Sequence, residues 1–133
     1  MARRTLYNGT AIPAAGTTTT DALVDFRDAA YLLMQANFDY GSGGTTVDVF
    51  VQTSIDGGTT WCDIAQWAFT TSDARRLHKV LAVSALAANT TPTDGTLADN
   101  TVLDGVIGDR IRGKMVVAGT YAASSLTLSI EAK

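Results

Sequence analysis

The chain has 133 residues, 46% of them hydrophobic and 17% charged, which suits one domain around one core and excludes a wholly disordered chain. Its formal net charge of −3, without a concentrated run of Lys or Arg, argues against nucleic acid as a partner. No apolar run approaches the roughly 20 residues that cross a bilayer, and the start lacks the apolar segment of a signal peptide, so no membrane partner is expected.

Residues 1–20 predict an extended N-terminal arm. They contain Pro13, Gly16 and an unbroken run of threonine over 17–20, with little periodic apolar content. Directly afterwards, from residue 21 on, larger apolar residues become frequent. We therefore predict a single β domain over residues 21–133.

Alternating apolar and polar residues predict strands in the first half of this domain. In residues 31–39 every second side chain from Leu32 to Phe38 is apolar, although helix propensity leaves a short helix over 28–35 as an alternative. After a glycine-rich turn, residues 45–53 alternate in the same way. Both segments are therefore expected to bury one face.

The clearest local pattern is a hairpin. The turn residues Asp56-Gly57-Gly58 separate the strand 45–53 from the aromatic-rich segment 61–69. Turn glycines of this kind supply the positive φ that a tight connection requires. We predict that these two segments pair.

The second half of the chain predicts further strands around one long loop. Residues 75–86 fit a strand or a helix, and the strand is favoured because the neighbouring segments are strands. Residues 87–105 form a loop that is long for a compact domain. Strands are expected over 110–117 and 126–132. The sum is an all-β fold, an antiparallel β-sandwich or jelly roll of about seven to eight strands whose order the sequence does not reveal.

The hairpin turn matches the Asp-box pattern, Ser-x-Asp-x-Gly-x-Thr-Trp, which occurs in turns of sialidase-like propeller blades and other β proteins. A structural role is expected, because a carboxylate can accept hydrogen bonds from turn amides and a Trp can cover the hairpin. One copy in a chain of this length cannot supply a propeller. The matching residues are Ser54, Asp56, Gly58, Thr60 and Trp61.

The sequence predicts no catalytic residue, cofactor or metal site, and hence a protein that is not an enzyme. His78 is the only histidine and is expected at the surface or half-buried. Cys62, the only cysteine, cannot form an intramolecular disulfide and is expected to be a small buried hydrophobe of a protein that folds in a reducing cytosol. Residues 94–100 are rich in oxygen side chains but depart from a calcium-binding loop.

Two groups of side chains suggest contacts with partners. The cations Arg110, Arg112 and Lys114 share one strand face, which is either a solvated face or a contact with an acidic protein. The N-terminal pair Arg3 and Arg4 is a second candidate for partner contacts.

Three aromatic residues offer a further alternative. Trp61, Trp67 and Tyr121 could stack on a sugar, as in a carbohydrate-binding module. Packing in the core or over the hairpin is favoured, since two of them belong to the hairpin segment.

Residues 51–65, residues 92–100 continuing to 108–112, and Gly119-Thr120-Tyr121 resemble small virion proteins of tailed bacteriophages. The resemblance implies a β-rich structural protein, located in a virion that assembles in the host cytoplasm, with no catalytic residue to carry over. An arm and a long loop suit contacts with neighbours, so we expect a capsid decoration, or cement, protein that stabilises the head. Its partners would be the major capsid protein or other virion proteins, and it would form a homo-oligomer, a dimer or trimer. The alternatives are a tail or head-to-tail connector subunit and a carbohydrate-binding module of a phage fibre.

Overall fold

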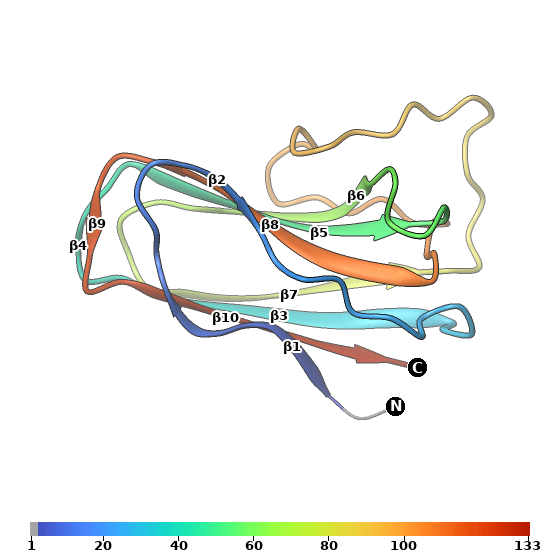
Figure 1. Cartoon of the computed structure of the whole chain (residues 1–133), viewed down its shortest axis with the longest axis horizontal. Helices are drawn as coiled ribbons and strands as arrows, with labels where there is room; N and C mark the ends of the chain where they lie inside the picture. The colour runs from blue at the N-terminus through green and yellow to red at the C-terminus, as the bar shows by residue number, and fades with distance from the viewer. Residues whose placement is uncertain (1–2) are drawn as a thin grey trace.

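Antiparallel strands make up the regular structure of the computed structural model, which describes residues 3–133 (Figure 1). No helix occurs in that range, and therefore none of the length and apolar character that a membrane span requires. In chain order the strands are β1 Arg4–Ala11, β2 Gly16–Thr19, β3 Tyr31–Asp39, β4 Ser42–Gly43, β5 Thr46–Ser54, β6 Cys62–Phe69, β7 Ala74–Leu81, β8 Arg110–Ala118, β9 Tyr121–Ala122 and β10 Ser125–Ala132.

The eight longer strands form two four-stranded sheets that pack face to face. One sheet has the order β1-β10-β3-β7 and the other β2-β8-β5-β6, with every pair antiparallel. Consecutive long strands lie in opposite sheets, except for β5 and β6, which pair with each other; this is the strand arrangement of a jelly roll. The expected all-β sandwich or jelly roll is therefore confirmed. The two-residue strands β4 and β9 pair with each other and bring the total to ten, above the expected seven to eight.

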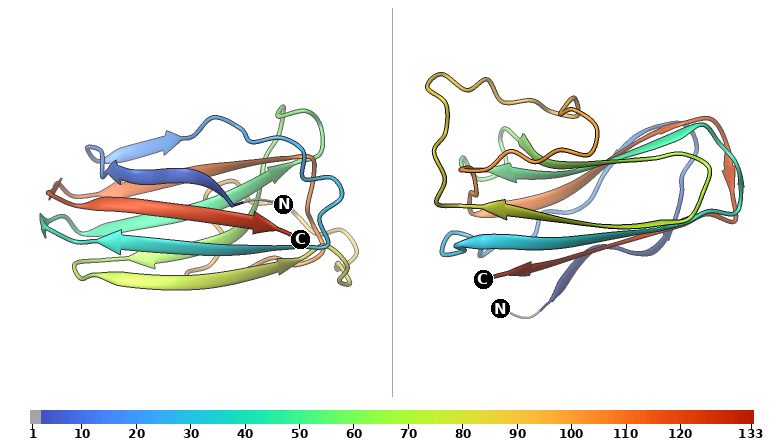
Figure 2. Two further views of the ribbon diagram at one scale, coloured as in Figure 1. Left: turned by 90° about the horizontal axis from the view of Figure 1, so that it is seen from below. Right: turned by 180° about the vertical axis from the view of Figure 1, so that it is seen from behind.

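The N-terminal residues are extended, but they do not form a separate arm. Strand β1 pairs with β10 and strand β2 with β8, so residues 4–19 supply one edge strand to each sheet (Figure 2). Tyr7 and Ile12 reach the core, whereas the side chains of β2 are all exposed. With so few buried apolar side chains, residues 4–19 show little of the alternation that predicts a strand. This explains why the sequence suggested an arm. Residues 1 and 2, also part of that prediction, lie outside the described range.

The core lies between the two sheets, because the side chains of each strand alternate between the inner and the outer face of its sheet. In β3 and β10 the residues facing the second sheet are buried, and in β5 and β8 every inward apolar side chain is buried as well. Residues 31–39 are thus a strand and not the alternative helix over 28–35. Residues 74–81 are a strand too, as favoured from the sequence, and β7 ends where the long connection to β8 begins.

The expected hairpin is present, with one irregularity. Strand β5 pairs with β6 through the turn 54–61, and the register shifts between Val51 and Gln52, so that Ile64 is the additional residue of a β-bulge. The bulge lies beside the end of the sandwich where the long connection folds over β6 (Figure 1).

Candidate functional site

The turn 54–61 is fixed by side-chain hydrogen bonds. Thr60 donates from its amide and its hydroxyl to the two carboxylate oxygens of Asp56, at 2.9 and 2.6 Å. The Ser54 hydroxyl donates to the same carboxylate at 2.8 Å and accepts from the amide of Gly58 at 2.9 Å. The Trp61 indole closes the turn by donating to the carbonyl of Gly58 at 3.1 Å. All five residues of the motif therefore meet in one bonded unit.

The hydrogen bonds at Asp56 predict an acid-sensitive contribution to stability. Donation from Thr60, then from Ser54, lowers the pKa of the Asp56 carboxyl from its ordinary value of 3.8 to about 2. A folded pKa below the unfolded one means that this contribution is complete above pH 3.8 and is lost as pH falls towards 2.

The check compares thermal unfolding of the native protein and Asp56→Asn from pH 7 down to pH 2. We expect the native protein to melt higher at neutral pH and the difference to shrink only below pH 3.8. A difference that stays constant over that acid range would show that the carboxylate charge plays no part.

The expected cationic face of β8 is committed to contacts within the chain. The Arg112 guanidinium lies 4.3 Å from the ring centroid of Trp61, and its Nε donates to the Gln52 side chain at 2.8 Å. Lys114 forms an ion pair with Asp94 at 2.8 Å and is largely buried. The prediction of a partner surface did not anticipate these contacts, because Asp94 lies 20 residues away in the chain.

Of the three remaining cations, Arg4 also makes contacts within the chain, and Arg110 is partly buried. The Arg110 Nε is buried, although no hydrogen-bond partner accepts from it among the described residues, and the Arg110 carbonyl accepts from the Thr53 hydroxyl at 3.0 Å. Arg4 donates to the carbonyl of Val24 and lies 5.0 Å from the ring centroid of Phe26. Arg3 is exposed. The structure thus brings Arg112 and Lys114 together at Asp94, whereas Arg4 contacts residues 24 and 26.

A buried carboxylate holds the long loop on the hairpin. Asp63 is fully buried in β6 and accepts from the Thr93 hydroxyl at 2.8 Å. It also accepts from the amides of Gly95, Thr96 and Leu97 at 2.8 to 3.2 Å. The side chain of Gln52 donates to the other carboxylate oxygen at 2.8 Å. The Asp63 carboxylate therefore accepts hydrogen bonds from three consecutive backbone amides of the loop.

Backbone hydrogen bonds extend this anchor along the edge of β6. The amide of Asp63 donates to Thr93, the amide of Gln66 donates to Thr101, and the amide of Leu103 donates to Ile64, all at 2.8 to 2.9 Å. The buried Gln66 side chain accepts from the amide of Asn100 and donates to Asp99. Residues 93–103 therefore cover an edge that would otherwise be open to pairing.

Neither Asp63 nor Gln66 was singled out from the sequence. Their partners in the long loop lie 30 to 35 residues away, so no spacing connects them. One sequence feature could have pointed to them: polar residues alternate with apolar ones in a predicted strand, and a long loop follows later in the chain.

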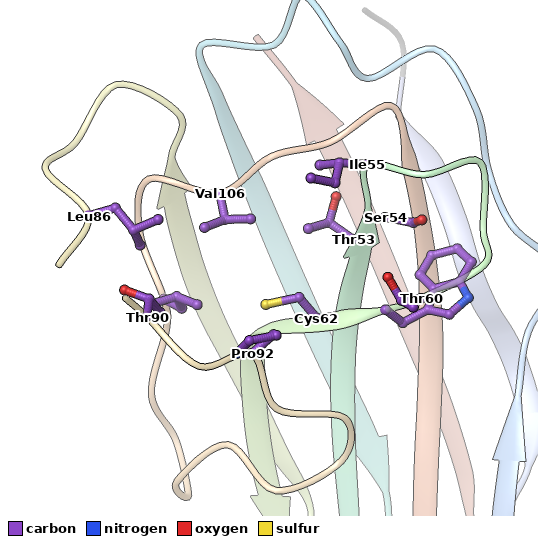
Figure 3. A pocket seen from close by; sticks show the side chains of 11 residues that line it. Thr53, Ser54, Ile55, Thr60, Cys62, Leu86, Thr90, Pro92 and Val106 are labelled. Carbon is purple, nitrogen blue, oxygen red and sulfur yellow. The ribbon is translucent and has the colours of Figure 1, made fainter. Parts of the chain in front are cut away.

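Between the turn 54–61 and the long loop lies a surface pocket of about 230 Å³ (Figure 3). Ile55 and Leu86 line opposite parts of its wall, with exposed fractions of 82% and 46%. The remaining lining residues are Thr53, Ser54, Thr60, Trp61, Cys62, Thr90, Pro92, Leu103 and Val106. The lining is mostly apolar, so the pocket is suited to receive apolar groups.

Cys62 is half-buried in this pocket, whereas the sequence analysis expected it to be buried. Burial, and next the nearby charge of Asp63, raise the pKa of the Cys62 thiol. The thiol therefore stays protonated near neutral pH and is a poor nucleophile. It is the one ionisable side chain among the described residues that line the pocket.

The three aromatic candidates are separated. Trp67 is fully buried in the core, where its ring lies 4.6 Å from the half-buried ring of His78. Tyr121 is also buried, and its hydroxyl donates to the carbonyl of Thr70. Trp61 lies alone at the hairpin under Arg112. They therefore form no common exposed platform.

Three oxygen side chains of the mostly exposed residues 94–100 bind to strands, including Asn100, which accepts from the amide of Ala68. Asp94 binds Lys114, and Asp99 accepts from Gln66. Within residues 3–133, no cluster of three or more His, Cys, Asp or Glu side chains has the arrangement to hold a metal ion.

Comparison of the chain with protein-family models, with curated proteins and with solved structures found no match. A jelly roll hosts many unrelated functions, so the fold alone does not assign one. The functional argument therefore depends on the site itself.

Proposed function

We propose that the protein is a non-enzymatic structural subunit of a tailed-bacteriophage particle and that it decorates the capsid shell. The observation that carries the proposal is the exposed apolar rim of the pocket. Ile55 at 82% and Leu86 at 46% exposure line it. Grouped apolar side chains at a surface favour burial against a partner.

The same end of the molecule gathers two of the three stretches that resemble virion proteins, whereas the third, residues 119–121, lies at the β4–β9 end (Figure 1). Residues 51–65 form the hairpin end, residues 92–100 lie along it, and residues 108–112 enter β8 beside β5. Segments far apart in the sequence thus build one surface. This supports a shared role for them in contact with another protein.

The bonding around Asp56 and Asp63 supports a docking role. Because the turn and the loop are already fixed, ordering them on binding has a small entropic cost. Weak contacts of this kind become effective when a lattice repeats them and each subunit belongs to a small closed oligomer. We therefore propose the major capsid protein as partner and a dimer or trimer as the binding form.

The test is the copy number in purified particles, measured by quantitative mass spectrometry. A decoration protein is expected at an abundance comparable to that of the major capsid protein, because it covers the shell. A single-ring abundance would instead identify the connector or tail alternative. Absence from particles would refute a virion role altogether, and glycan binding would then test the fibre-module alternative.

A matched pair of variants tests the surface itself. Ile55→Asp at the pocket rim is expected to lower occupancy on particles about tenfold or more, since a buried charge disrupts an apolar contact. Thr17→Asp, which alters an exposed residue of β2 outside the pocket, should leave occupancy unchanged. Equal occupancy of both variants would contradict docking through this end.

A further inference from the structure

The four edges of the two sheets differ in their protection. The edge of β6 is covered by residues 93–103. Strand β1 shifts register twice along β10, and β2 has only four residues. Strand β7 has eight residues and pairs with β3 without a register shift, and it lies at the margin of its sheet (Figure 2). It is therefore the long regular edge among the described strands.

The hydrogen-bond pattern shows which backbone groups of β7 face outward. In an antiparallel pair, residues alternate between those bonded to the neighbouring strand and those directed away from it. The amide of Ala82 donates to Ala30, at the start of β3, so Leu81 is directed outward. Consistently, Leu81 donates to the Asp104 side chain and accepts from the amide of Gly105.

The same alternation directs the backbone of Arg75, Leu77 and Lys79 to the open edge. These residues also place their side chains on the outer face of the sheet, because Val80 faces the core and side chains alternate. Leu77 is 62% exposed, and both cations are exposed. The edge thus offers three outward backbone positions under a cation, an apolar residue and a cation.

The charge of this edge is unusual for the molecule. The chain carries a net charge of −3, yet Arg75, Arg76 and Lys79 lie within five consecutive positions. Among residues 3–133, no ion pair involves any of the three. Lys79 is held 5.2 Å from the ring centroid of Tyr31, which leaves its ammonium group available.

We propose that the β7 edge binds an extended acidic segment of another protein by strand addition. The added strand would exchange backbone hydrogen bonds with residues 75, 77 and 79. Its outward side chains would follow the order acid, apolar, acid, opposite Arg75, Leu77 and Lys79. A groove of about 210 Å³ on the outer face, lined by Leu33 and Leu77 among others, lies beside the apolar position.

Charge favours this partner over a second copy of the chain. Two copies that pair through β7 around a two-fold axis would bring cations against cations, which is unfavourable in a sheet. An acidic strand removes that repulsion and pairs every cation. This inference does not depend on the proposed capsid role, because it concerns the β7 edge and not the pocket, and because it can be tested on the isolated protein.

The test uses an acetylated and amidated peptide in which Glu, Val and Glu alternate with Thr. Binding is followed by fluorescence anisotropy, and amide hydrogen exchange is followed by NMR. We expect slower exchange for the amides of Arg75, Leu77 and Lys79 in the complex, with no change at Arg76 and His78, which face β3. Binding without this alternation, or exchange protection that grows with protein concentration alone, would overturn the proposal.

Charge reversal supplies the control. Lys79→Glu should weaken binding of the acidic peptide about tenfold, because an attractive cross-strand pair becomes a repulsive one. Arg27→Glu, which alters a 71% exposed cation elsewhere, should have no effect. The double variant R75E/K79E should instead prefer the peptide with Lys in place of Glu. If neither peptide binds its matched protein, the cations only protect the edge from pairing.

Discussion

Asp63→Ala is expected to lower the free energy of unfolding by about 3 kcal/mol, because several buried donors lose their acceptor at once. The carboxylate accepts hydrogen bonds from Thr93, from three consecutive loop amides and from Gln52. Urea denaturation measures the loss. Hydrogen exchange should show residues 93–103 opening before the strands, since their main attachment to β6 is removed.

Asp94→Ala is the matched control for Asp63→Ala. It removes a carboxylate from the same loop, but that side chain is 54% exposed, and its principal partner is Lys114. Although Lys114 is largely buried, solvent reaches the Asp94 carboxylate and screens the ion pair, so we expect a loss of about 1 kcal/mol. Equal losses in the two variants would show that burial of Asp63 adds nothing to the anchoring of the loop.

The contrast between these two aspartates illustrates the limit of prediction from the sequence. Asp63 lies between Cys62 and Ile64, and Asp94 lies between Thr93 and Gly95, but only the folded chain buries the first carboxylate and exposes the second. Their roles depend on where a long irregular loop returns to the sheet. No local pattern encodes that return, because the bonded residues are 20 to 34 positions apart.

The strands with clear alternation could be predicted, because burial of one face imposes a period of two on the sequence. That rule located β3, β5 and the final strands, and the glycines of the turn located the hairpin. Strands β1 and β2 were taken for an arm, since Tyr7 is the one fully inward side chain of β1 and β2 has none. Edge strands can be held by backbone pairing alone, which leaves little trace in composition.

The candidate site was predictable only in part, for a related reason. The turn residues from Ser54 to Trp61 form a local motif, and the structure joins them within eight positions. The pocket needs Leu86, Leu103 and Val106 as well. The sequence placed Leu86 at the end of the segment 75–86, Leu103 in the long loop 87–105, and Val106 just after that loop. An irregular segment has no period to reveal its buried side.

Phe38→Ala is expected to cost about 4 kcal/mol, the usual range for a large aromatic residue removed from a packed core. The fully buried Phe38 ring stacks on Phe69 at 5.1 Å between centroids and meets Tyr121 edge-on at 5.9 Å. On the same strand, Leu33→Ala alters a 37% exposed side chain and should cost less than about 1 kcal/mol.

The two destabilising variants should fail in different ways. Phe38 lies near the end of β3 that leads to β4, where it joins both sheets through Phe69. The β4–β9 pair and the long connection lie at opposite ends of the sandwich (Figure 1). Removal of the Phe38 ring should therefore raise hydrogen exchange in all strands together, because a domain of this size unfolds as one cooperative unit. Asp63→Ala should first expose the loop alone. Phe38→Ala could instead raise hydrogen exchange only at its own end and leave residues 93–103 as protected as before. The two ends of the sandwich would then unfold independently, and the core at one end would not stabilise the docking surface at the other.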